Sequence, residues 1–115
     1  MQLIGDLAVG LELEFEGVSS RKSGELLAEN GLMNLWEAHT DNSLRPRDCN
    51  TEFVFRGPLR DGFVVEAVQG LMPIVARDKY ELSWRCGMHV HVDHRKATRG
   101  DVIKETVLGC LLDRV

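Results

Sequence analysis

The sequence predicts an α+β domain built on a largely antiparallel sheet, and three patterns support this prediction. Residues Val9–Glu16 alternate apolar and acidic side chains, as a strand with one buried face does. Residues Cys86–Asp93 alternate in the same way, with histidines among the polar positions. Apolar residues with helical spacing begin after Asp61, and strands joined by helices of mixed length favour the α+β class.

Length and charge restrict the kind of protein further. The chain has 115 residues, enough for one domain with a modest core, and its formal net charge is −4. An acidic chain is not expected to carry a nucleic-acid surface, although ATP stays compatible when a cation neutralises its charge. No 18-residue apolar run or signal-peptide pattern is found, so no membrane partner is expected. Three cysteines without C-x-x-C spacing predict a reducing, cytoplasmic location.

The first half of the chain should contain two strands with a helix between them. After the strand at Val9–Glu16, a helix is expected over Ser23–Asn30, with Ser23 as its N-cap and Gly31 as its end. A second strand is expected over Met33–Thr40. The polar turn at 41–43 and a loop to residue 50 should follow it.

The middle of the chain should contain a short strand and a longer helix. Thr51–Arg56 is predicted to be a strand that Gly57 and Pro58 end. Asp61 can cap the next helix, and Pro73 should end or kink it near Met72.

The last third is expected to hold an irregular stretch, a strand and a helix. Arg77–Arg85 is ambiguous between loop and irregular strand, and Cys86–Asp93 is the histidine strand. Asp101–Val115 has helical apolar spacing but no capping residue at its end. This predicts a polypeptide cut within a larger fold.

Polar side chains share one face on each of the two patterned strands. They are Glu12, Glu14 and Glu16 on the first strand and His89, His91 and Asp93 on the second. Like charges on one face are unfavourable unless water or a cation neutralises them. Two imidazoles about 6.5–7 Å apart can hold one metal, or a metal and a phosphate. Taken alone, each set also fits the solvated face of a half-buried strand.

The order of the motifs is more specific than any one of them. In chain order they are Gly10–Phe15, Trp36, Asp41-x-Ser43-Leu44, Glu52–Leu59 and Cys86–Asp93. This succession resembles the amidoligase family of carboxylate–amine ligases, which is similar to glutamine synthetase and glutamate–cysteine ligase. Gly87–His91 also match the Gly-Met-His-x-His stretch of glutamine synthetase.

The resemblance implies a curved, largely antiparallel sheet with helices on one face, like the catalytic half of glutamine synthetase, and ATP with Mg²⁺ or Mn²⁺ on the concave face. Glu12 and His89 would bind the metal next to the transferred phosphoryl group. Glu14 would bind the metal nearer the acceptor substrate, with Glu52 as its partner. Carboxylates with one histidine suit Mg²⁺ or Mn²⁺, whereas a cluster of histidines and thiols would favour zinc.

Other positions take supporting roles by the same resemblance. His91 would contact ATP phosphate, and Asp41 and Ser43 would lie on the substrate side. Glu16 has no counterpart and is expected to be solvated or to neighbour a metal ligand. Arg85 could meet phosphate, although lone arginines are mostly solvated.

The implied activity is an ATP-dependent ligase that joins a small-molecule or peptide carboxylate to an amine through an acyl phosphate. Family members are usually longer, so residues 1–115 are expected to form the N-terminal part of the catalytic domain. The chain could otherwise be a naturally short member or complete its site with a second copy. A non-catalytic metal- or nucleotide-binding or assembly module is the alternative, and a zinc hydrolase using His89 and His91 is a third.

Overall fold

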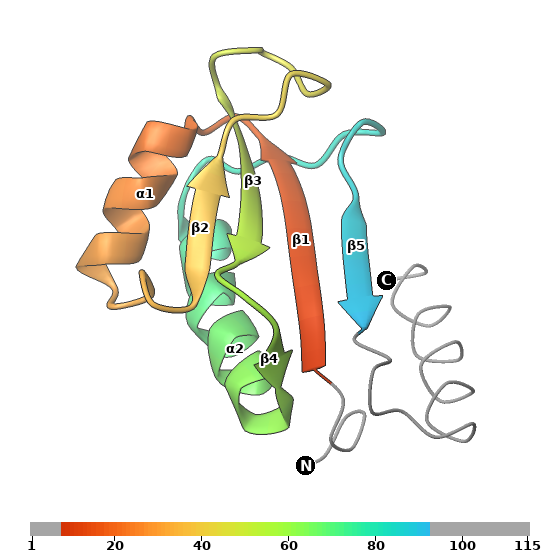
Figure 1. Ribbon diagram of the computed structural model, residues 1–115. Coiled ribbons are helices and arrows are strands. Elements are labelled where there is room, and N and C mark those ends of the chain that lie inside the picture. Colours follow the sequence, from red (N-terminus) through yellow and green to blue (C-terminus); the bar gives the residue numbers. More distant parts are fainter. Residues whose placement is uncertain (1–7, 93–115) are drawn as a thin grey trace.

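The computed structural model describes residues 8–92, which form an antiparallel five-stranded sheet and two α-helices (Figure 1). The strands are β1 Ala8–Glu16, β2 Trp36–His39, β3 Asn50–Phe55, β4 Leu59–Arg60 and β5 Met88–Val92, and the helices are α1 Ser20–Glu29 and α2 Asp61–Arg77. The predicted α+β class and antiparallel sheet are therefore confirmed. Asp93 and the helix predicted over Asp101–Val115 lie outside the described residues.

β1 is the central strand on which the rest of the sheet is assembled. β3 and then β4 pair with one side of β1, β2 pairs with β3, and β5 pairs with the other side of β1 (Figure 1). The register sets Glu14 opposite Glu52 on β3 and Glu12 opposite His89 on β5. Residues that are directly opposite in a ladder share a face, so the acidic and histidine patterns lie together on one side of the sheet.

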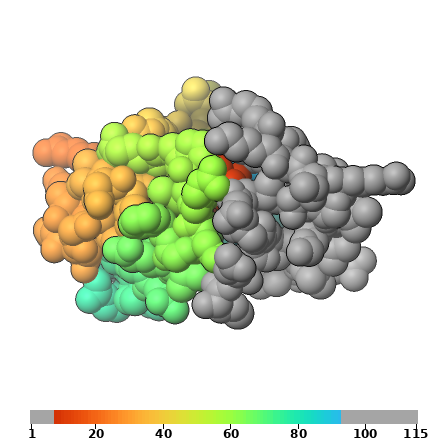
Figure 2. Space-filling view, turned by 60° about the horizontal axis from the view of Figure 1, so that its bottom comes forward, coloured from red at the N-terminus to blue at the C-terminus, as the bar shows by residue number. Residues whose placement is uncertain are grey.

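The other side of the sheet carries the core. Apolar side chains of β1, β2 and β3 pack there against apolar side chains of both helices, and Figure 1 shows α2 behind the sheet. The centre of this layer is Trp36, which is fully buried and donates its indole N–H to the Ala67 carbonyl at 2.9 Å. From the end where β1 begins, α2 and β4 form one surface with α1 beside them (Figure 2). The face opposite this core carries the polar positions of the strands.

Helix α1 begins earlier than the sequence predicted. Ser19 is its N-cap and accepts a hydrogen bond from the Lys22 amide at 3.1 Å, so the assignment of Ser23 as the cap was wrong. The Ser23 hydroxyl is fully buried and bonds to the hydroxyls of Thr51 (2.6 Å) and Tyr80 (2.7 Å). A serine can cap a helix or satisfy a distant buried hydroxyl, and the local pattern does not separate the two.

Other boundaries differ from the prediction as well. The N-cap of α2 is Arg60, with Asp61 as the first residue of the helix, and the short strand β4 was not predicted. Strand β2 is shorter than Met33–Thr40, because the amides of Leu35 and Trp36 bond back to the Leu32 carbonyl in a turn. Helix α2 continues through Pro73 to Arg77, because Leu71 and Ile74 are buried on the core side while Pro73 faces outward. Neither helix in this part of the chain is long and apolar enough to cross a membrane.

Candidate functional site

The candidate site lies on the open face of the sheet, where β1 lies between β3 and β5. Glu12 Oε2 is 3.3 Å from His89 Nδ1, and Glu12 Oε1 is 3.8 Å from His91 Nε2. Glu14 Oε1 is 4.0 Å from the same His89 nitrogen, and Glu52 faces Glu14 across the β1–β3 ladder. The prediction that the acidic and histidine strands share a sheet and a face is confirmed. The ligand roles of these residues remain predictions.

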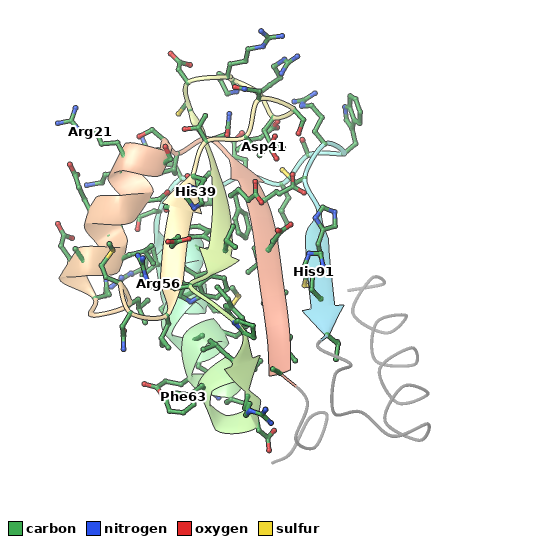
Figure 3. All side chains as sticks on the ribbon, viewed as in Figure 1. Arg21, His39, Asp41, Arg56, Phe63 and His91 are labelled. Carbon is green, nitrogen blue, oxygen red and sulfur yellow. The ribbon has the colours of Figure 1, made fainter. Side chains whose placement is uncertain are left out.

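Asp41 adds a carboxylate from the loop after β2. Its side chain forms a hydrogen bond with the carboxyl group of Glu14. It also accepts the Ser43 amide at 2.8 Å and the Ser43 hydroxyl at 2.7 Å. Figure 3 shows Asp41 at the end of the sheet where β1 finishes, with His91 on β5. Asp41 therefore lies beside the candidate metal ligands, and Ser43 holds it in place, while the substrate-side role of the two residues stays a prediction.

The electrostatics of this cluster show a shortage of positive charge. Burial raises the pKa of Glu14 to about 7, and the hydrogen bond and negative charge of Asp41 add to the effect. The hydrogen bonds from Ser43 lower the pKa of Asp41. Burial and the charges of Glu12 and Asp41 raise the pKa of Glu52. Near neutral pH, Glu14 is therefore the group that retains a proton, in a hydrogen bond to ionised Asp41.

Glu16 is the clearest correction to the sequence analysis. It is only 4% exposed, so the expectation of a solvated side chain was wrong. Its carboxylate accepts Arg85 Nε at 2.8 Å and Nη2 at 3.0 Å, and these bonds lower the pKa of Glu16 to about 2. The sequence analysis considered Arg85 as a phosphate contact, and its pairing with Glu16 could not be predicted because the two residues lie far apart in the chain and meet only through the fold.

Gly87 allows a close approach of the Glu14 carboxyl group to the backbone. A Cβ atom built on Gly87 would lie 2.9 Å from Glu14 Oε1 and 3.6 Å from His89 Nε2. The Gly87 carbonyl also accepts the Glu14 amide at 3.0 Å, which fixes the two residues side by side. The sequence marked Gly87 as part of the histidine strand and of the Gly-Met-His-x-His match. The structure shows that the missing side chain of Gly87 lets the Glu14 carboxyl group lie close to this backbone, next to His89.

The donor set suits a hard divalent cation. Glu12, Glu14, Asp41 and Glu52 offer carboxylate oxygens and His89 offers one imidazole, which fits Mg²⁺ or Mn²⁺ better than zinc. Within residues 8–92, no three or more His, Cys, Asp or Glu side chains lie in positions from which they could bind one metal ion together. In the described residues these groups contact one another, Glu14 with Asp41 and Glu12 with His89. Cation binding would therefore require side-chain rotations that exchange these contacts for bonds to the ion.

Comparison of the chain with protein-family models, with curated proteins and with solved structures finds no match. The resemblance to amidoligases therefore rests on the order of the motifs along the chain. The contacts and charges of the open face provide a separate basis for assigning chemistry.

The pKa values of Glu14 and Glu16 predict how stability depends on pH without divalent cations. The pKa of Glu14 rises from 4.5 to about 7 on folding, so its stabilising effect is complete below pH 4.5 and is lost as the pH rises through 7. The loss is at most about 3 kcal/mol. Glu16 acts oppositely: its pKa falls to about 2, so its contribution is present above pH 4.5 and lost as the pH falls towards 2.

Urea unfolding in EDTA between pH 2 and 8 measures both effects. We expect the free energy of unfolding to fall between pH 4.5 and 7 in the wild type and to fall much less in Glu14→Gln. Glu52 titrates in the same direction as Glu14, so a smaller decline should persist in the variant. Parallel curves for the two proteins would show that Glu14 does not hold a proton in the folded state.

Proposed function

We propose that this protein binds Mg²⁺ or Mn²⁺ together with ATP on the open face of its sheet. We propose further that it is an ATP-dependent carboxylate–amine ligase, or the N-terminal part of one. The observation that carries the proposal is the gathering of four carboxyl groups and an imidazole from β1, β3, β5 and the loop after β2.

The charges favour a cation at this position. Glu14 is 8% exposed and lies against both Asp41 and Glu52, and His89 is the basic group that lowers its pKa. Carboxylates placed this close repel one another, and either a proton or a divalent ion relieves the repulsion. Glu12, Glu14, Glu52, Asp41 and His89 would hold the ion, and the glycine at position 87 would let Glu14 keep its place beside His89.

A cation site of this kind suits the chemistry of an ATP-dependent ligase. A carboxylate is a poor electrophile, and transfer of the ATP γ-phosphoryl group converts it to an acyl phosphate that an amine can attack. The cation supplies the positive charge that lets an anionic carboxylate approach an anionic triphosphate. The side chain of His91 is 67% exposed beside Glu12, so it can reach a phosphate group from the open face.

One observation favours the second candidate, a cation- or nucleotide-binding module without turnover. Arg85 lies at the end of β1 and forms an ion pair with Glu16. The guanidinium of Arg45 is also engaged, with the carbonyls of Asn42 and Leu44. Phosphoryl transfer benefits from arginine or lysine at the triphosphate, and these two arginines are committed to the protein.

Thermal unfolding with Mg²⁺, Mn²⁺ and ATP tests the proposal. Occupation of the site at about 100 times the dissociation constant should add about 2.7 kcal/mol to the free energy of unfolding. We expect a rise in Tm with either metal, and a larger rise when ATP is added with the metal than without it. Metal shifts without any effect of ATP would favour the binding module.

Matched glutamine variants show whether the shift belongs to this site. Glu14→Gln should abolish the metal-induced rise in Tm. Glu37→Gln removes a glutamate from β2, where it pairs with Arg56 at 2.9 Å, and should retain the rise. Equal shifts in wild type and Glu14→Gln would mean that Glu14 binds no metal.

A further inference from the structure

Two connections meet over the end of β1 at Glu16. One is the stretch of residues 40–49 between β2 and β3, and the other is the stretch of residues 78–87 between α2 and β5. Both stretches contact Glu16 through side-chain and backbone hydrogen bonds. This is why Glu16, which alternation places on the open face of β1, is buried at the end of the strand.

The Glu16 carboxylate links the two connections directly. Its Oε2 atom accepts the backbone amide of Arg45, from the first connection, and Arg85 Nε, from the second. Its Oε1 atom accepts Arg85 Nη2 at 3.0 Å, which makes the contact with the guanidinium two-pronged. Charged groups with several hydrogen bonds in a buried setting fix geometry closely, because a displaced partner leaves a charge unpaired.

Each connection carries part of the candidate site. Asp41 lies four residues before Arg45 and reaches the carboxyl group of Glu14. Gly87 lies two residues after Arg85, accepts the Glu14 amide at 3.0 Å and leads into His89. The link through Glu16 is therefore close in sequence to both groups that flank Glu14.

We propose that the Glu16–Arg85 pair positions the cation site: it holds the Asp41 connection and the stretch leading to His89 over the same end of β1, so that both flank Glu14. This assigns a positioning role to two residues that touch neither metal nor substrate. It rests on the proposed cation binding, and it predicts that the pair affects metal affinity rather than stability alone.

Other contacts anchor the same connections, but at different points. Tyr80 lies against the rings of Phe15 and Phe53, with centroids 5.6 and 5.7 Å away, and Glu81 exchanges backbone hydrogen bonds with Glu16. These contacts hold the beginning of the second connection, whereas Arg85 holds its end beside Gly87. The Asn50 side chain binds the Asp41 amide and the Pro46 and Arg47 carbonyls, so it orders the first connection internally. Glu16 joins the first connection to the second.

The test uses the full chain and compares Arg85→Gln with Arg56→Gln, a matched control that also loses one ion pair to a glutamate. Mn²⁺ affinity is measured by titration calorimetry, and amide hydrogen exchange is measured without metal. We expect Arg85→Gln to weaken Mn²⁺ binding about tenfold and Arg56→Gln to leave it within about twofold. The amides of Glu14 and Ser43 should exchange faster in Arg85→Gln only, since they bond to Gly87 and Asp41.

Arg85→Lys keeps the positive charge but loses the two-pronged contact with Glu16. If Arg85→Gln does not fold, Arg85→Lys is used in its place. It should show an intermediate loss of affinity. Unchanged Mn²⁺ affinity and unchanged exchange in a folded Arg85 variant would overturn the positioning role. If wild-type protein binds no Mn²⁺, the proposed cation site is overturned. In that case, faster amide exchange at Glu14 and Ser43 in the Arg85 variant would still identify the Glu16–Arg85 pair as the link between the two connections.

Discussion

In a catalytically complete form of the proposed ligase, Glu12→Gln and His89→Ala are each expected to abolish coupled ADP release. Glu12 Oε2 and His89 Nδ1 lie 3.3 Å apart across β1 and β5, so both could bind one ion, which the proposal places beside the transferred phosphoryl group. Loss of either ligand misplaces the charge that offsets repulsion during phosphoryl transfer, and we expect the rate to fall about 100-fold or more. His91→Ala should weaken ATP use more than metal binding, because its proposed partner is phosphate.

The measurement is coupled ADP release over a panel of amino acids and small amines. ADP and phosphate should appear only when a carboxylate and an amine are both present. The same panel is run on any longer version of the gene product, since the amidoligases that the sequence resembles usually carry further ligands in a C-terminal half. Activity in a longer version alone would identify these residues as half of a ligase site. No activity in either, with metal binding intact, would favour the binding module.

Gly87→Ala is expected to weaken cation binding by about tenfold or more while leaving the fold intact. The new methyl group would lie 2.9 Å from Glu14 Oε1 and 3.6 Å from His89 Nε2, so it would push the Glu14 carboxyl group out of its place. The Gly87 backbone has no positive φ, so alanine can adopt its conformation, and the bond between the Glu14 amide and the Gly87 carbonyl can persist.

Gly24→Ala is the matched control. Gly24 lies within α1, and a Cβ atom there would meet nothing within 4 Å. Alanine should raise the stability of the helix by up to about 1 kcal/mol and leave Mn²⁺ affinity unchanged. Calorimetric titration and Tm, measured for both variants, separate binding from stability. Equal Mn²⁺ affinity in Gly87→Ala and wild type would show that cation binding does not depend on the position of the Glu14 carboxyl group beside Gly87.

The zinc hydrolase reading receives less support from the side chains than cation binding by carboxylates does. His89 and His91 both face Glu12, and carboxylates supply most of the donors around them. Cys86, the cysteine closest to the histidines in sequence, contacts Ser83 and the Glu81 carbonyl. A mainly oxygen donor set favours Mg²⁺ or Mn²⁺.

The sequence by itself indicated β1, β3 and β5 and the faces of β1 and β5, but not the bounds of β2 or the short strand β4. Alternation in β1 and β5 is a local property, because each side chain of a strand points opposite to its neighbours. The burial of Leu11 and Leu13 and the placement of Glu12 and His89 on the open face follow from it. Gly31, with a φ of 68°, likewise marks the end of α1, because few other residues adopt that conformation.

Only the tertiary structure decided which distant groups meet. Ser23 joins Thr51 and Tyr80 instead of capping a helix, and Glu16 pairs with Arg85 instead of facing water. Asp41 reaches Glu14 because a loop folds over the end of the sheet. Local patterns report which face a residue takes, whereas a contact between distant residues depends on strand register and on the path of the connections. That is why the sequence indicated the ligand types, and the fold decided how they are held together.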